Sequence, residues 1–289
     1  MTIEPDRNDE AADLSNLRST DVSQSMIAYT RHAWRRRHFA YAMPAERFRS
    51  RHQNTVLGNV WNLLSPLLTA GVYFLIFALV LNASRGIDNY ILWLVIGLFV
   101  FRLTNATVMQ GASSITGRQG LVRSLKFPRV LLPVSTTIGE LLPFMFEVII
   151  LFVFAFATGE GVTWRVVVLP AVLVLHTVFN LGLALIVARL NDSFRDVQQF
   201  LPFVFMLMRY LTGVMIPVSR FADAGPSWVY YLISWNPLVQ IIDLYRWAFM
   251  PETVDITTLD LAHAIGVSIL VLLIGYRFFI KAEHRYGRP

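Results

Sequence analysis

The sequence predicts an all-α integral membrane protein with six transmembrane helices, and three observations support this fold class. Apolar residues make up 55% of the chain and charged residues only 15%, whereas a soluble domain carries about a quarter charged residues. The apolar residues gather in runs of roughly 20, the number needed to cross a ~30 Å hydrocarbon core. The cations of this basic chain flank these runs, where membrane topology accounts for them, so nucleic-acid binding is not expected.

The segment before the first apolar run divides into two parts. Residues 1–25 hold six acidic residues and few large apolar ones, and we expect them to form a disordered acidic cytoplasmic tail. Residues 26–52 are expected to form an interfacial amphipathic helix, because aromatic residues such as Tyr29 and Trp34 alternate there with arginines. Pro44 should interrupt this helix, and residues 53–289 then form the transmembrane domain.

Six apolar runs are expected to span the membrane: residues 61–81, 90–109, 133–157, 166–188, 197–216 and 259–280. The segment 218–251 does not fit a span, because it carries four charged residues and is interrupted by Pro226 and Pro237. Two short re-entrant helices between spans 5 and 6, dipping into the outer leaflet and returning, satisfy its length and its breaks. Non-helical backbone at that depth must be buried in protein or face a water-filled cavity.

The distribution of Lys and Arg orients these spans. Seven arginines lie between Arg31 and Arg51, four cations follow the second span, and three more lie in the C-terminal residues 281–289. The opposite loops hold only scattered arginines. Because cytoplasmic segments carry the excess of positive charge, both termini of this multi-pass protein are expected in the cytoplasm.

The loop at residues 117–133 combines four cations with no acid, and its apolar residues are spaced like one face of a short helix. Such a helix either lies on the lipid surface or docks into a soluble partner. Docking is favoured, because residues 121–125 and Phe127 would form an apolar ridge inside a charged rim of Arg123, Lys126 and Arg129. The alternative is a solvated basic loop that only sets the topology.

The sequence shows no sign of an enzyme active site. It contains no cysteine, which excludes disulfides, thiolate metal sites and cysteine nucleophiles. No Gly-rich phosphate loop and no clustered His/acid metal pattern occur, so no metal or cofactor is expected in this chain. His176 and His263 lie within spans and are expected to be hydrogen-bonded packing residues, because a catalytic base needs a positioned partner.

Ionisable residues inside the spans are costly and tend to face a partner or water. They are Arg102, Glu140, Glu147 and Arg209. From the rise of about 1.5 Å per helical residue, Glu140 falls level with Arg102 and Glu147 level with Arg209. We therefore expect two buried pairs, Glu140–Arg102 and Glu147–Arg209, that hold the spans together. A separate partner or water for each charge is the alternative.

Four stretches, in the same order, resemble the ABC-2 type permease family. Residues 49–66 read Arg-Ser-Arg-His-Gln-Asn-Thr-Val-Leu-Gly-Asn-Val-Trp-Asn-Leu-Leu-Ser-Pro, similar to the family's basic–T–x–L–G–x–x–W–x–L–L–x–P entry to the first span. Residues 125–133 resemble its cytoplasmic segment, Phe194-Arg195-Asp196-Val197 the start of its fifth span, and Trp235-Asn236-Pro237-Leu238 with Tyr245-Arg246 its outer gate helices. The likeness extends from about residue 45 to the end, and is greatest to exporters of polysaccharide, teichoic acid and O-antigen, including the mycobacterial lipid-linked galactan exporter.

This resemblance implies a permease subunit, not an enzyme, in a bacterial cytoplasmic (inner) membrane. It would act as a homodimer with two copies of a separate ATPase that binds ATP and Mg, and would export a lipid-linked glycan such as galactan past membrane lipids. The basic loop then becomes a coupling helix, with contacts expected from Arg123, Lys126, Phe127, Pro128 and Arg129. Sugar faces stack on aromatic rings, so aromatic residues are expected to line the channel and gate, with packing as the alternative role for each. The candidates are Tyr73, Phe74, Phe77, Phe99, Phe101, Tyr210, Tyr230, Tyr231, Trp235, Tyr245 and Trp247.

Two other functions are compatible with part of this pattern. A drug or lipid exporter of the same family would share the topology, but the arginine-rich aromatic helix before the first span weighs against it. A secondary transporter would normally show internal repeats and intramembrane acids at a break near the midplane. No convincing repeat between the two halves is present.

Overall fold

The computed structural model describes residues 26–41, 61–81, 86–125, 127–161, 163–224, 226–283 and 286, and the regular structure within them is helical. The predicted acidic tail and the break at Pro44 lie outside these residues. The helices are α1 (Met26–Arg35), α3 (Trp61–Phe74), α4 (Tyr90–Thr116), α5 (Gln119–Ser124), α6 (Leu131–Ala157), α7 (Leu169–Ser193), α8 (Val197–Leu211), α9 (Arg220–Ala224), α10 (Ser227–Ser234), α11 (Pro237–Phe249) and α12 (Thr258–Ile280). A π-helical segment (Leu75–Val80) continues α3, and a 3₁₀ turn (Trp164–Val168) precedes α7.

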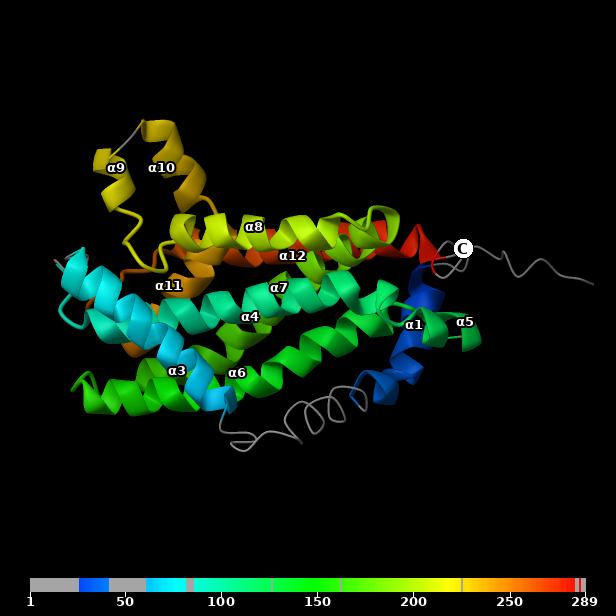
Figure 1. Cartoon of the computed structure of the whole chain (residues 1–289), viewed down its shortest axis with the longest axis horizontal. Coiled ribbons are helices and arrows are strands. Elements are labelled where there is room, and N and C mark those ends of the chain that lie inside the picture. Colours follow the sequence, from blue (N-terminus) through cyan, green and yellow to red (C-terminus); the bar gives the residue numbers. More distant parts are fainter. Residues whose placement is uncertain are drawn as a thin grey trace, which may run out of the picture.

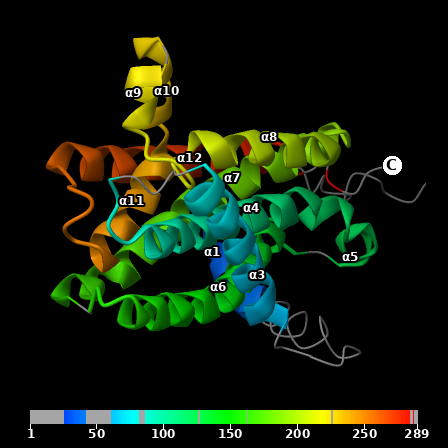
Figure 2. The ribbon, with the colours of Figure 1, turned by 60° about the vertical axis from the view of Figure 1, so that its left-hand side comes forward.

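The long helices α4, α6, α7, α8 and α12 run approximately along the long axis of the molecule (Figure 1). Helices α1 and α5 lie at one end of this bundle, beside the end of α12. At the other end, α9 and α10 stand out from the bundle in both views (Figure 1 and Figure 2). Following the predicted topology, we refer to the end with α1 and α5 as the cytoplasmic end and to the opposite one as the outer end.

Four of the described helices are long and apolar enough to cross a membrane: Tyr90–Thr116, Leu131–Ala157, Trp164–Ser193 and Thr258–Ile280. They correspond to the second, third, fourth and sixth predicted spans. The apolar helix Leu64–Val80 is shorter, and α8 has 15 residues. The first and fifth spans therefore stay predictions.

Helix α4 is longer than the hydropathy pattern predicts, because it continues past Met109 to Thr116. Its last turns are polar, and α7 supplies their partners. The Asn191 side-chain amide donates to the Ala112 carbonyl oxygen (2.8 Å) and to the Thr116 hydroxyl (3.2 Å). Further along the same two helices, the His176 ring shares a 2.7 Å hydrogen bond with a threonine hydroxyl of α4 and is fully buried. The structure thus places His176 as a hydrogen-bonded packing residue, as expected.

Small residues bring the neighbours of α7 very close to it. At Gly182 an added Cβ would lie 2.6 Å from the backbone nitrogen of Leu272 on α12. At Gly111 on α4 an added Cβ would lie 2.6 Å from the Cβ of Ala184. Close approach through small residues is typical of membrane bundles, where helix association depends on packing more than on the exclusion of water. α7 is therefore packed tightly between α4 and α12 through small residues.

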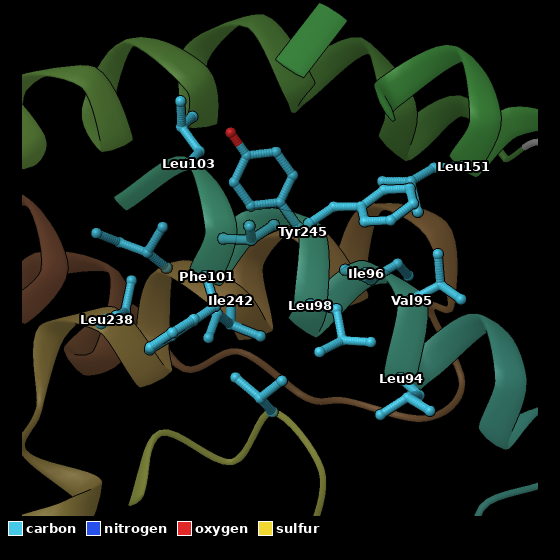
Figure 3. Packing of buried hydrophobic residues seen from close by; sticks show 14 of the residues in the cluster. Leu94, Val95, Ile96, Leu98, Phe101, Leu103, Leu151, Leu238, Ile242 and Tyr245 are labelled. Carbon is cyan, nitrogen blue, oxygen red and sulfur yellow. The ribbon is translucent and has the colours of Figure 1, made fainter. Parts of the chain in front are cut away.

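Three short helices, not the two that the sequence predicts, lie between α8 and α12. The third helix, α11, begins at Pro237, and the Asn236 side chain caps it by accepting a hydrogen bond from the Leu238 amide (3.0 Å). Much of α11 is buried against α4, and Figure 3 shows the Tyr245 ring among Phe101 and other apolar side chains. The exposed aromatic side chains of this segment lie on or next to α10.

Candidate functional site

At the cytoplasmic end, three segments far apart in the sequence meet at Glu283, just after α12. The backbone amide of Arg129 donates to the Glu283 carboxylate (3.0 Å), and the Arg129 guanidinium donates to the Glu283 carbonyl oxygen. The Tyr29 hydroxyl of α1 accepts a hydrogen bond from the Val130 amide (3.3 Å) and also bonds the Glu283 side chain. We call Tyr29, Arg129 and Glu283 the cytoplasmic junction.

The cytoplasmic junction is partly shielded from water, since Tyr29 is buried and Arg129 and Glu283 are half-buried. Burial raises the pKa of Glu283, although hydrogen bonds from Tyr29 and Arg129 oppose this shift. Burial and the neighbouring Glu283 charge also raise the pKa of Tyr29 above its ordinary value, so the phenol keeps its proton for donation. Apolar side chains of α1, α5, α6 and α12, among them Val122 and Phe279, form one cluster around the junction. The interfacial helix, the basic loop and the end of α12 therefore form one packed unit.

Only part of the predicted coupling segment faces outward. Arg123 at the end of α5 is exposed, and Leu125 is 53% exposed. Val122, one residue before Arg123, is buried, so the apolar ridge predicted over 121–125 is divided between the bundle and the surface. Lys126 lies outside the described residues.

The rest of the coupling segment anchors the loop to the protein. Phe127 is half-buried and packs on Phe39, with ring centroids 4.9 Å apart. Pro128 is buried, and Arg129 is held by the cytoplasmic junction. The predicted charged rim therefore does not include Arg129 as an outward cation. The cause is a long-range contact with the end of α12, which no local pattern in the loop indicates.

A hollow of about 330 Å³ lies beside this anchor, and it is lined by Arg36, His38, Phe39, Leu125, Phe127 and Leu131. On α1, Trp34 is 69% exposed, and the Arg37 guanidinium lies 5.5 Å from its ring centroid. The cytoplasmic end thus presents basic and apolar groups together, a combination suited to docking a soluble protein.

In the middle of the bundle, Glu147 pairs with Arg102, so the prediction that it pairs with Arg209 is wrong. Its carboxylate accepts a hydrogen bond from Arg102 (2.8 Å) and forms an ion pair with it, whereas Arg209 was assigned to it by the depth estimate. The reason is geometric, because Arg102 on α4 and Glu147 on α6 both lie about three helical turns from the outer ends of their helices. Counting the depth of both residues from the outer ends of their helices would have predicted the Arg102–Glu147 pair. Glu140 is buried about two turns closer to the cytoplasm.

Arg209 lies instead among aromatic residues of two other helices. Its guanidinium donates to the Tyr73 hydroxyl (2.6 Å). It lies 5.7 Å from the ring centroid of Tyr73 on α3 and 5.6 Å from that of Phe101 on α4. We call Arg209, Tyr73 and Phe101 the arginine–aromatic cluster. Arg209 thus joins α8 to α3 and α4 through neutral partners.

The aromatic residues predicted for the channel and gate divide by exposure. Phe77, Phe99, Phe101 and Tyr245 are buried in the main core cluster, where their position supports packing. Tyr73, Phe74, Tyr230 and Trp247 are half-buried, and Tyr210, Tyr231 and Trp235 are exposed. Trp247 lies 4.7 Å beneath the Arg165 guanidinium. A substrate-facing role stays a prediction for the half-buried and exposed residues.

Arg246 on α11 is a functional candidate that the search for charges inside spans did not find. It is 2% exposed, donates to the carbonyl oxygens of Gly213 (2.8 Å) and Trp93 (3.4 Å), and lies 3.5 Å from the Trp93 ring centroid. It also pairs with Asp243 one turn earlier (3.1 Å). We call Arg246, with its partners Asp243, Trp93 and Gly213, the outer clamp. It fastens α11 to α4 and to the chain after α8. The Tyr245-Arg246 motif marks this residue in the sequence, but the motif does not indicate that its side chain is buried.

Comparison of the sequence with known proteins finds one matching family and several relatives. Residues 40–250 match the family described as ABC-2 type transporter. An O-antigen export system permease protein, RfbA, of Klebsiella pneumoniae is 29% identical over 239 residues, covering 82% of this chain and 89% of that protein. RfbA of Myxococcus xanthus is 28% identical over 246 residues, with 85% and 93% covered. A polysialic acid transport protein, KpsM, of Escherichia coli is 23% identical over 249 residues, with 81% and 90% covered.

Proposed function

The chain belongs to the ABC-2 type transporter family, and we propose that it is the permease subunit of an ATP-driven exporter of a lipid-linked polysaccharide. The relatives named as O-antigen and polysialic acid transport proteins support this substrate class, because each is matched over most of its length. The drug or lipid exporter is less well supported, since the relatives named above are O-antigen export and polysialic acid transport proteins.

The observation that carries the proposal is the packed unit at the cytoplasmic end. Arg123 and Leu125 are exposed, and the loop that follows them is fastened to α1 and α12 by the cytoplasmic junction. A force applied to α5 would therefore reach the interfacial helix and a long apolar helix together. A permease driven by a separate ATPase needs such a rigid contact.

The finer parts of the proposal follow from the same arrangement. Two copies of this chain would associate with two copies of the ATPase, which binds ATP and Mg, in the bacterial cytoplasmic membrane with both termini inside. Galactan is the glycan we propose. The outer clamp would hold α11 in place at the outer end, where exposed Tyr231 and Trp235 offer rings for sugar stacking.

Charge reversal at Arg123 tests the coupling surface. Arg123→Glu should leave the protein folded, because the side chain is exposed, but should detach the ATPase or lower ATP-dependent polysaccharide export at least about tenfold, as expected for a lost charged contact in an interface. Co-purification of the ATPase and export in proteoliposomes measure the two effects.

Arg277→Glu is the matched control, since Arg277 is an exposed arginine of α12 outside the proposed surface. It should co-purify and export normally. Normal export by Arg123→Glu would show that the loop serves topology alone.

A further inference from the structure

The arginine–aromatic cluster lies near the middle of the bundle. Phe101 lies about three helical turns from the outer end of α4 and about four turns from its cytoplasmic end, and the Arg209 guanidinium lies over its ring. Arg209 is half-buried. Its position between α3, α4 and α8 places a full positive charge at a depth where apolar side chains predominate.

The partners of Arg209 hold its guanidinium without cancelling its charge. A hydroxyl accepts from Nη1, two rings lie near it, and Nε is buried without a hydrogen-bond partner among the described residues. Within those same residues, no carboxylate forms an ion pair with it. Arg102 differs, because Glu147 neutralises it. Charges inside membrane segments that lack a counter-charge typically mark a substrate or ion pathway.

An anionic group on the substrate would provide the missing counter-charge. A glycan carried on a lipid is joined to it through phosphate, and this anion has to pass the apolar layer during export. Arginine is well suited to phosphate, because its planar guanidinium offers several donors to the phosphate oxygens. We propose that Arg209, positioned by Tyr73, binds the phosphate group of the lipid-linked glycan midway through the membrane. This inference rests on the proposed function and names the part of the substrate that the site takes.

Two residues at a similar depth in the bundle are compatible with this role. The Arg102 side chain is 31% exposed while its partner Glu147 is 1% exposed, so the ion pair presents its cationic side to the surroundings. Tyr210, next to Arg209 on α8, is 46% exposed and provides a ring for a sugar attached to the phosphate. Arg102 follows Phe101 and Tyr210 follows Arg209 in the sequence, so both lie at a similar depth to the arginine–aromatic cluster, although adjacent residues of a helix point to different faces.

Binding of farnesyl diphosphate to the full-length chain in lipid nanodiscs tests the site, with farnesol and inorganic pyrophosphate as the other two probes. Arg209→Gln should weaken farnesyl diphosphate binding about 10- to 100-fold, the effect of losing hydrogen bonds to a charged group, and should leave farnesol binding unchanged. Arg277→Gln, the same change at an exposed arginine of α12, should have no effect. Tyr73→Phe, which keeps the ring but frees the guanidinium, should weaken binding several-fold.

Unchanged affinity of Arg209→Gln for farnesyl diphosphate overturns the proposal, and so does equal binding of farnesol. Inorganic pyrophosphate that binds as tightly as farnesyl diphosphate overturns the assignment to a lipid-borne phosphate. Should Arg209→Gln not fold, Arg209→Lys replaces it in the test, with a loss of affinity of about tenfold expected because lysine lacks the planar fork.

If wild-type complexes export polysaccharide while Arg209 variants bind farnesyl diphosphate normally, only this site fails. If Arg209 variants lose binding while wild-type complexes export no polysaccharide, only the proposed function fails.

Discussion

Single arginines placed among apolar helices account for much of the tertiary specificity of this chain. Arg102, Arg209 and Arg246 lie among apolar helices, and each guanidinium has partners of a different kind. These are a carboxylate for Arg102, a hydroxyl and aromatic rings for Arg209, and backbone carbonyls for Arg246. The Arg246 arrangement also restricts its neighbour, since a Cβ added at Gly97 would lie 2.8 Å from Nη2 of Arg246. Removing a partner in such a site leaves polar groups unpaired in a place that water does not reach.

Arg246→Met should destabilise the protein by about 3 kcal/mol, because it leaves Asp243 without its cation and the carbonyl of Gly213 without its donor. Arg246→Lys should lose less, since it keeps the charge but not the fork. The melting temperature of the purified protein in detergent measures both. Arg277→Met is the control at an exposed site. A melting temperature for Arg246→Met equal to that of the control would show that the outer clamp contributes nothing.

At the scale of the helices, the crossing of α7 and α12 depends on the absence of side chains. Gly182 and Gly275 face each other there, and a Cβ at either position would collide with the backbone of the other helix. Gly266, on the same helix as Gly275, has open space around it. The two kinds of glycine make a matched pair for a measurement.

Gly182→Ala should destabilise the protein by roughly 1–3 kcal/mol, the cost of overpacking a close contact that cannot yield. Gly266→Ala should be neutral or stabilise by up to about 1 kcal/mol, because alanine is the better helix former. Thermal unfolding of the two variants, compared with the wild type under the same detergent conditions, provides the test. Equal melting temperatures would contradict the packing described for α7.

The helices were largely predictable from the sequence, whereas their contacts were not. Hydropathy located four membrane-length helices, because burial in lipid demands long apolar runs. It ended α4 too early, because the polar residues after Met109 find a hydrogen-bond partner in Asn191 of another helix. The basic loop was recognisable from its cations. That Arg129 turns inward to Glu283 depends on residues 154 positions apart, a separation that no periodicity reports. The partner of Glu147 was missed for a different reason, because the depths of residues on α4 and α6 were counted from opposite ends of the two helices.

At the scale of the whole molecule, the charged and aromatic sites are ordered along one axis. Helix α5, which carries Arg123, lies at the cytoplasmic end, and α10 stands at the outer end (Figure 1). The arginine–aromatic cluster lies about midway along α4, and the Arg246 clamp contacts Trp93 in the first turn of α4, toward the outer end. The cytoplasmic junction links the loop after α5 to α12. In the proposed function, ATP hydrolysis beneath the membrane moves the helices that carry the cluster and the clamp.

The measurement that tests this account most directly is ATP-dependent polysaccharide export by the chain and its ATPase in proteoliposomes. We expect lipid-linked polysaccharide to reach the protected side only when both proteins and hydrolysable ATP are present. An ATPase variant that binds but does not hydrolyse ATP should reduce export to the background. Export that persists with this variant, or that follows an ion gradient instead of ATP, would contradict the account.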